Sequence, residues 1–224
     1  MKANSPLVVF NPDDVARGLE LLNQANASNP PPAYMELLNE PDIPLSGRGP
    51  ISPRAAAKAV QPILDYNKAH NVTTLLAPAL SHPDGIFDAD GWLTQFDGNC
   101  SGCITSMDTP IIATHQYNLD AEGVLKSLNK IHKRWPKHSI WVTELAPAVH
   151  AWNNCPMTVE EVGDWMETVV RGTAELDYVE RIFWNSGEWR PKISNHDCIH
   201  SLTHDDGTAT PLLKRYESLC KNLS

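Results

Sequence analysis

Positive charge is scarce in this sequence and is nowhere clustered. The 224 residues include 18 lysine and arginine residues against 27 aspartate and glutamate residues, a formal net charge of −9. Nucleic acids and anionic membranes attract basic surfaces. We therefore expect neither as a partner, and a neutral or weakly charged ligand fits the composition better.

Long apolar runs are also missing. None approaches the roughly 20 residues needed to span a bilayer, and the opening MKANSP lacks the apolar stretch of a signal peptide. A different feature favours secretion, because the acceptor pattern for N-glycosylation occurs at Asn26, Asn71, Asn99 and Asn222. Such short motifs often arise by chance, so each alone is weak and only the four together carry weight.

Cysteines are few and odd in number. Cys100 and Cys103 form a C-x-x-C pair, and Cys155, Cys198 and Cys220 stand apart. A structural zinc site usually needs a second such pair. We expect a local disulfide or two buried thiols at Cys100 and Cys103, and the odd cysteine has no explanation in the sequence.

The hydrophobic content is sufficient for one sizeable core. Hydrophobic residues make up 42% of the chain, which has seven tryptophans, and α/β barrels of about this size usually form one domain. We therefore expect residues 1–224 to form a single globular domain.

Short apolar runs alternate with helical patterns, which is typical of a parallel sheet covered by helices. The predicted strands span residues 7–10, 33–38, 73–77, 111–115, 140–143 and 179–184. Between them we predict helices capped by Asp13, opened by Ser52 before Pro53 and running to His70, stopped by Pro136, and capped by Thr158 with Glu161. A last helix is expected near the C-terminus.

Polar side chains recur where these strands end. They are Asn39 and Glu40, His115 and Tyr117, Glu144, and Asn185. In a parallel α/β sheet the carboxyl ends of the strands lie at one edge, where active sites are found. The sequence therefore predicts a site at this edge.

Glu40 in LNEPD and Glu144 in WVTELAP carry the chemistry of this prediction. Two carboxylates across a cleft can hydrolyse a glycosidic bond, one as proton donor and the other as nucleophile or base. A separation of about 5 to 5.5 Å gives retention of configuration through a covalent intermediate. A strand-terminal glutamate taken singly is more often a cap or an ion-pair partner, and the combination favours catalysis.

Aromatic residues favour a sugar ligand. Trp184 at a strand end and Trp92 in an expected loop are candidate platforms for pyranose rings, whereas Trp135 and Trp165 have helical spacing and suit the core. His115 could be a metal ligand, a general base or a hydrogen-bonding residue. Without a cluster at ligand spacing we expect no metal and no cofactor.

The motifs LNEPD, SPRAAA, LLAPAL, the C-x-x-C segment leading to IIATHQY, and IWVTELA occur in an order that resembles glycoside hydrolase family 128. This is the fungal glycosyl hydrolase catalytic core of the alkali-sensitive-linkage protein type. The resemblance covers about Tyr34 to Trp184, and DDGTATPLLKRY resembles the closing segment of the family.

The resemblance implies a (β/α)8 TIM barrel and a retaining endo-β-1,3-glucanase acting on cell-wall β-glucan. Glu40 would be the acid/base and Glu144 the nucleophile. Asn39 would bind the sugar 2-hydroxyl, His115 and Tyr117 would line the subsite beside the nucleophile, and Trp184 would be a sugar platform. The resemblance also implies secretion or a cell-wall location for the full-length protein, and a monomer.

Two strands lie between the two glutamates, as the resemblance requires. Only one strand is predicted before Tyr34, which begins the strand that leads to Glu40, whereas the family has three there. We therefore expect a chain that is N-terminally incomplete, lacking the first two βα units and the signal. Two alternatives to the glucanase stay open: a glucan-binding protein with impaired catalysis, and a related barrel glycosidase with another β-glycan substrate.

Overall fold

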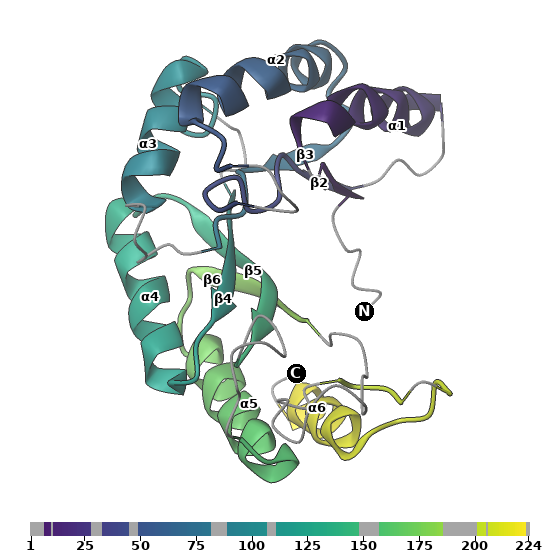
Figure 1. Ribbon diagram of the computed structural model, residues 1–224, viewed down its shortest axis with the longest axis vertical. Coiled ribbons are helices and arrows are strands. Elements are labelled where there is room, and N and C mark those ends of the chain that lie inside the picture. Colours follow the sequence, from purple (N-terminus) through teal and green to yellow (C-terminus); the bar gives the residue numbers. More distant parts are fainter. Residues whose placement is uncertain are drawn as a thin grey trace. The chain divides into compact units, whose positions relative to one another are not determined.

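A computed structural model describes residues 7–9, 11–27, 33–44, 49–81, 89–106, 111–147, 157–185, 201–204 and 206–222 (Figure 1). The chain divides into two compact units. The first comprises residues 1–115 and 134–141, and the second comprises residues 116–133 and 142–224. The prediction of a single domain stays a prediction.

The first unit contains a sheet of three parallel strands, β1 (Leu7–Val8), β2 (Tyr34–Glu36) and β3 (Thr74–Leu76), in that order. The pairing continues past the strand ends through bridges between Asn39 and Ala79 and between Leu80 and Thr114. Met35 and Leu76 are fully buried, as expected for a parallel sheet with both faces covered. The predicted strands are confirmed here with shorter bounds.

Helices of the first unit begin at residues that satisfy their free amide groups. Ser52 accepts a hydrogen bond from the amide of Ala55 at 3.2 Å and opens α2 (Pro53–His70), as predicted. The expected cap at Asp13 is wrong. Asn11 instead accepts from the Asp13 amide at 2.9 Å and caps a short 3₁₀ helix, η1 (Pro12–Asp14), which leads into α1 (Val15–Ala27).

Helix α3 (Ala89–Asn99) has no counterpart in the predicted elements, because its two glycines weaken the helical signal. It contacts α2 (Figure 1) and buries Trp92 and Phe96, whose rings stack at a centroid distance of 5.5 Å. The Trp92 indole donates to the Ile51 carbonyl at 2.9 Å. Trp92 is therefore a core residue, and the interpretation of it as a sugar platform in a loop is wrong.

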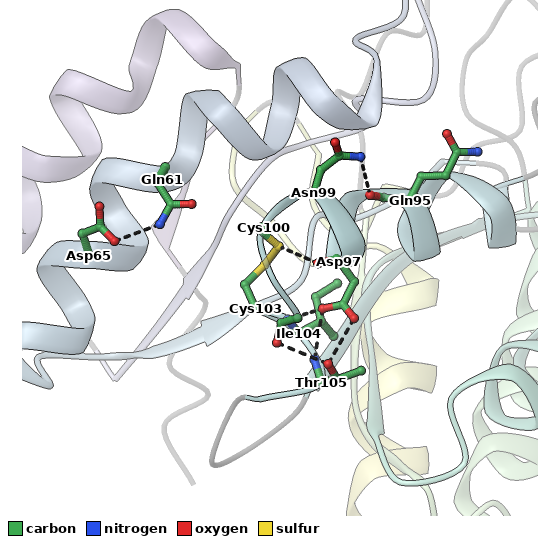
Figure 2. Close-up of a disulfide and its surroundings, with 10 residues drawn as sticks. Gln61, Asp65, Gln95, Asp97, Asn99, Cys100, Cys103, Ile104 and Thr105 are labelled. Carbon is green, nitrogen blue, oxygen red and sulfur yellow. Dashed lines mark hydrogen bonds between the residues drawn. A yellow bond between two sulfur atoms is a disulfide. The ribbon is translucent and has the colours of Figure 1, made fainter.

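Cys100 and Cys103 form a disulfide in the turn that follows α3 (Figure 2). The buried Asp97 carboxylate accepts from the amides of Ile104 at 2.7 Å and Thr105 at 3.2 Å, and from the Thr105 hydroxyl at 3.1 Å. The disulfide alternative is thus confirmed. Closing so short a loop stabilises by only about 2 kcal/mol, so the Asp97 hydrogen bonds contribute to the turn on a similar scale.

Strands β4 (Ile111–Tyr117), β5 (Ser139–Ala146) and β6 (Val179–Trp184) form a sheet in that order, and β4 and β5 each contribute residues to both units. Helix α4 (Ala121–Arg134) ends before Pro136, as predicted. Trp165 is buried in the second unit and its indole donates to the Asn118 carbonyl at 2.9 Å. The core assignment of Trp165 is confirmed, as is that of Trp135 in the first unit.

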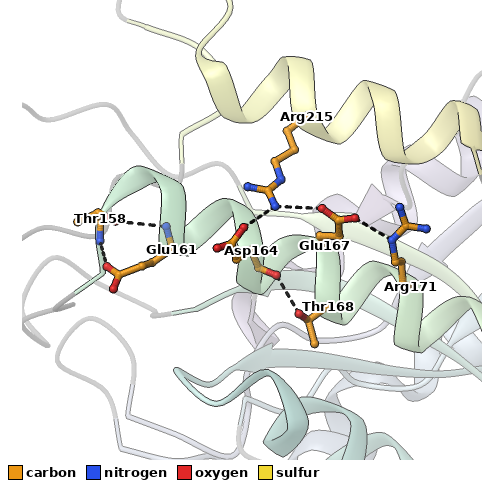
Figure 3. A network of polar contacts seen from close by, with 7 residues as sticks. All are labelled: Thr158, Glu161, Asp164, Glu167, Thr168, Arg171 and Arg215. Atoms are coloured by element: carbon orange, nitrogen blue, oxygen red, sulfur yellow. Dashed lines mark hydrogen bonds and ion pairs between the residues drawn. The ribbon is translucent and has the colours of Figure 1, made fainter.

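The second unit also contains α5 (Val159–Ala174) and α6 (Pro211–Asn222). Thr158 and Glu161 form the predicted capping box at the start of α5. Figure 3 shows Arg215 of α6 reaching Asp164 and Glu167 of α5, at 2.5 Å and 3.0 Å. A side chain at Gly163 would meet the Arg215 guanidinium at 2.5 Å, so this glycine leaves the space in which the arginine lies.

Over the described residues the strands form two three-stranded sheets and no closed barrel. The mixed α/β class with parallel strands is confirmed, and the eight-stranded barrel and the missing units are not. No helix among these residues is both long and apolar enough to cross a membrane. Cys220 is a free, exposed thiol, and Cys155 and Cys198 lie outside the described residues.

The Arg215 cluster predicts a pH-dependent contribution to stability. Hydrogen bonds from Arg215 and then Arg171 lower the pKa of Glu167, so the ionised carboxylate favours the folded state above its ordinary pKa and loses this effect as the pH falls. Arg215→Met should lower the Tm by about 1–3 °C at pH 7, and the difference from the unmodified protein should narrow as the pH falls below the ordinary pKa of glutamate.

Thermal unfolding followed by circular dichroism at several pH values measures this difference. Arg17→Met is the matched control, because among the described residues the ion pair of Arg17 is with Glu20 of its own helix, at 2.7 Å. Arg17→Met should change the Tm less than Arg215→Met does. A gap of equal size at pH 7 and pH 3 would show that packing, rather than charge, causes the Arg215 effect.

Candidate functional site

Glu40 lies in a turn that follows β2 and is fixed by the neighbouring strand. Its amide donates to the Ala79 carbonyl at 2.9 Å, and the Ala79 amide donates to the Leu38 carbonyl at 2.9 Å. Pro41 then ends the ladder, since proline has no amide hydrogen to donate. The residues that end the pairing of this strand therefore also position the Glu40 carboxylate.

The backbone of Glu40 is in the left-handed region, with φ of 45°. For a residue with a side chain this conformation costs about 1–2 kcal/mol, and such residues cluster at functional sites. The surrounding hydrogen bonds hold Glu40 there. A glycine would fit the turn with less strain, so the side chain at this position is retained at a cost to stability.

Asp42 provides a second link between this turn and the region after β3. The Asp42 side chain is buried, and one carboxylate oxygen accepts from the Ser81 amide at 3.0 Å. Leaving that buried amide without an acceptor would cost about 1–3 kcal/mol. The residues after β2 are thus attached both at Ala79 and at Ser81.

His115 of β4 contacts the Glu40 carboxylate within the first unit. The distance from His115 Nδ1 to Glu40 Oε1 is 2.8 Å, and the two side chains are 1% and 9% exposed. The contact is a hydrogen bond, and it becomes an ion pair when the imidazole is protonated. The hydrogen-bonding role of His115 thus has a partner in the structure, the Glu40 carboxylate.

Glu144 lies within the second unit beside a tyrosine and an asparagine. The Tyr117 hydroxyl donates a short hydrogen bond to Glu144 Oε2. The Asn185 amide donates to the same oxygen at 3.0 Å and to the Tyr117 hydroxyl at 2.5 Å. All three side chains are half-buried. One carboxylate oxygen thus receives two donors, which fixes its position.

Asn185 is one of the polar residues predicted at strand ends, but the sequence predicts no functional role for it. The backbone amide of Asn185 donates to the carbonyl of Leu145, the residue after Glu144, at 2.9 Å. This backbone contact aligns the end of β6 with β5 and directs the Asn185 side chain to the carboxylate. The sequence signal for it was the position alone.

The strand bounds change the local setting of several predicted residues. Glu144 lies inside β5, and His115 and Tyr117 lie inside β4, rather than after these strands. Asn39 forms the bridge with Ala79 and its amide donates to the Val9 carbonyl at 3.2 Å. Trp184 ends β6 and contacts Trp165 edge-to-face at 5.9 Å.

These contacts define two groups, one in each unit. Glu40 with His115 can exchange a proton in a nearly dry environment. Glu144 with Tyr117 and Asn185 can act as a nucleophile or stabilise positive charge, since it is oriented and partly exposed. The structure describes no contact that assigns a substrate to either group, so the roles predicted for these residues stay predictions.

The family model described as the glycosyl hydrolase catalytic core matches residues 9–216. A search of curated proteins finds no match. Among solved structures, the chain is similar to a family 128 (subgroup II) endo-β-1,3-glucanase from Pseudomonas viridiflava. The sequences are 25% identical, the TM-score is 0.68, and the alignment covers 94% of this chain and 78% of that one.

Two further solved structures belong to other subgroups. An oligosaccharide-binding protein of subgroup VII from Trichoderma gamsii is 21% identical, with a TM-score of 0.68 over 97% of this chain and 80% of that one. A subgroup I endo-β-1,3-glucanase from Amycolatopsis mediterranei in complex with laminaritriose is also 21% identical, with a TM-score of 0.67 over 95% and 80%.

The shared fold and the family match confirm the predicted resemblance to glycoside hydrolase family 128. With a match that extends over residues 9–216, the chain belongs to the glycosyl hydrolase catalytic core family.

Proposed function

We propose that this chain is a retaining endo-β-1,3-glucanase in which Glu144 is the nucleophile and Glu40 the acid/base. The observation that carries the proposal is the contrast between their environments. Glu144 Oε2 receives hydrogen bonds from Tyr117 and Asn185, whereas Glu40 is buried against His115. Two carboxylates in different environments are the usual requirement for separate acid and nucleophile roles.

In the first step, Glu144 attacks the anomeric carbon while Glu40 gives its proton to the leaving glycosidic oxygen. The bond between the anomeric carbon and that oxygen breaks, and a covalent glycosyl–Glu144 ester forms. This step requires the two carboxylates to flank one glycosidic bond about 5–5.5 Å apart. The two donors at Glu144 Oε2 hold the carboxylate in one orientation for the attack.

In the second step, Glu40 acts as a base. It takes a proton from a water molecule, whose oxygen attacks the anomeric carbon and displaces Glu144. Glu40 thereby recovers the proton for the next cycle. No cofactor or metal takes part in either step of the proposed reaction.

His115 fits the proposed cycle through its contact with Glu40. With only 1% of its side chain exposed, it has little surface for a sugar and is placed to orient the carboxylate in both protonation states. Asn39 is proposed to bind the sugar 2-hydroxyl, Tyr117 to line the subsite beside the nucleophile, and Trp184 to form a platform for a sugar ring.

The proposed substrate is a β-1,3-glucan. The Amycolatopsis mediterranei relative was solved with laminaritriose, and the Pseudomonas viridiflava relative is an endo-β-1,3-glucanase, which supports this ligand class. We further propose a TIM-barrel arrangement for the two sheets, a monomer, and a secreted or cell-wall location.

A second candidate function is glucan binding without turnover. The similarity to an oligosaccharide-binding protein from Trichoderma gamsii has the same TM-score, 0.68, as that to the Pseudomonas viridiflava glucanase. The two functions differ in one measurement, since a binding protein would sediment with insoluble β-1,3-glucan and release no soluble sugar from it.

Replacement of the two glutamates tests the glucanase directly. Glu144→Ala should abolish release of oligosaccharides from laminarin, because no covalent intermediate can form. Glu40→Ala should reduce the laminarin rate by about 10²–10⁴-fold and should spare aryl glycosides, whose activated leaving groups need no proton. Reducing-sugar release and aryl-glycoside hydrolysis measure the two rates.

Glu160→Ala is the control, because Glu160 is exposed in the first turn of α5 and should keep full activity. Full laminarin activity in the Glu40→Ala/Glu144→Ala double variant would exclude the proposed mechanism.

The Asn185 contact gives an independent test of the proposed nucleophile. Asn185→Ala removes one donor from Glu144 Oε2. A hydrogen bond to a charged group contributes about 1.5–3 kcal/mol, so its loss should lower kcat/KM by about 10–100-fold. Asn185→Asp places a second carboxylate where the donor was, and two neighbouring carboxylates do not both ionise readily.

The acid limb of the pH–rate profile should therefore move further toward higher pH in Asn185→Asp than in Asn185→Ala, because the aspartate adds a second negative charge as well as removing the donor. Steady-state kinetics from pH 4 to 8 distinguish the two variants. Identical profiles for both would contradict the role given to Asn185.

A further inference from the structure

Asn71 presents an unoccupied side chain at the end of α2. It has left-handed backbone angles, φ 50° and ψ 49°, and its amide hydrogen bonds to the Asn67 carbonyl at 2.6 Å. The residue is exposed, and its side chain has no hydrogen-bond partner in the described part of the chain. Asparagine tolerates this conformation, so the backbone alone would explain either asparagine or glycine here.

The side chain of Asn67 holds the turn in a way that directs Asn71 outward. Asn67 Oδ1 accepts from the amides of Val72 at 3.1 Å and Thr73 at 3.0 Å, and Nδ2 donates to the Thr73 carbonyl at 2.8 Å. These bonds satisfy the backbone between α2 and β3 without any contribution from Asn71. The exposed amide of Asn71 is therefore not needed by the fold.

Thr73 adds a second, independent observation. Thr73 is 7% exposed, and its hydroxyl is buried with no hydrogen bond to any described residue. A buried hydroxyl without a partner costs about 1–3 kcal/mol, and valine has nearly the same shape and suits the start of a strand better. The folded structure therefore gives no reason for a hydroxyl at this position.

Asparagine at 71 and threonine at 73 are together the acceptor sequence for N-glycosylation. That modification requires the hydroxyl two residues after the asparagine, which accounts for a threonine that the fold does not use. The acceptor role explains both residues more fully than their structural roles do.

The other acceptor sequences differ from this one in their surroundings. The Asn99 amide donates to the Gln95 carbonyl at 2.7 Å in the last turn of α3, and the next residue, Cys100, is buried in the disulfide. The side chains of Asn26 and Asn222 lie outside the described residues. Between the two side chains that are described, Asn71 is the one left free.

The position of Asn71 in the first unit is compatible with an active enzyme. Asn71 precedes β3, where Tyr34 is paired with Thr74, whereas Glu40 lies beyond the pairing of Asn39 with Ala79 at the carboxyl end. The two residues are thus at opposite ends of the same pair of strands. A glycan at Asn71 would be directed away from the Glu40 end.

We propose that Asn71 is an N-glycosylation site. The donor would be a lipid-linked oligosaccharide pyrophosphate. A bond forms between Asn71 Nδ2 and the anomeric carbon of the first sugar, the bond from that carbon to the pyrophosphate oxygen breaks, and the amide loses one proton as the lipid pyrophosphate leaves. The proposal places the chain in a secretory compartment, and it does not depend on catalytic activity.

Secretion of the full chain from yeast, directed by an added secretion leader, tests the proposal. Peptide mass spectrometry of the purified protein should find a glycan on at least half of the peptides that contain Asn71. Treatment with peptide-N-glycosidase should increase the electrophoretic mobility and convert the modified asparagine to aspartate. Recovery of secreted protein with Asn71 wholly unmodified would overturn the proposal.

Two variants separate the acceptor from the fold. Asn71→Gly keeps the left-handed turn and should lose the glycan, as should Thr73→Val. After enzymatic removal of glycans, Thr73→Val should melt at the same temperature as the unmodified sequence or higher. A decrease of several degrees would show that the Thr73 hydroxyl stabilises the fold and would remove the basis of the proposal.

Laminarin hydrolysis by the Asn71→Gly variant provides a separate reading. Unchanged activity together with loss of the glycan is the expected result. If the protein without substitutions carries the glycan but does not hydrolyse laminarin, the glycosylation site stands and only the proposed glucanase is contradicted. The two proposals therefore fail by different measurements.

Discussion

The pairing between the residues that follow β2 and those that follow β3 is the constraint on which the candidate site depends. Ala79 both donates to the Leu38 carbonyl and accepts from the Glu40 amide, and it is these two bonds that hold Glu40 in a left-handed conformation. The next residue, Leu80, is bridged to Thr114 and accepts from the His115 amide at 3.0 Å. One short segment therefore positions both members of the Glu40–His115 pair.

Much of this fold could be predicted from local patterns. Apolar runs located all six described strands, and the α2 and α5 starts followed from Ser52 before Pro53 and from the Thr158–Glu161 pair. Helix α3 was not predicted, because its stability comes from the burial of Trp92, Leu93 and Phe96 rather than from helix propensity. Propensity is a local property, and burial becomes known only when the neighbouring helix is placed.

The site was predictable as a set of residue types and not as a set of contacts. Strand ends indicated Glu40, Glu144 and Asn185, but strand length depends on pairing, and β5 extends past Glu144 to Ala146. The contacts of Glu144 join residues 27 and 41 positions apart in the chain. No sequence pattern specifies which of several polar side chains will reach a given oxygen across such separations.

The turn after α3 has a consequence for how the chain acquires its shape during synthesis. Because Cys100 and Cys103 are separated by three positions, their sulfurs can meet before the residues that follow them have been made. Asp97 collects the amides of Ile104 and Thr105 within the same dozen residues. Residues 97–105 can thus become ordered through contacts among themselves, without waiting for a partner from another part of the chain.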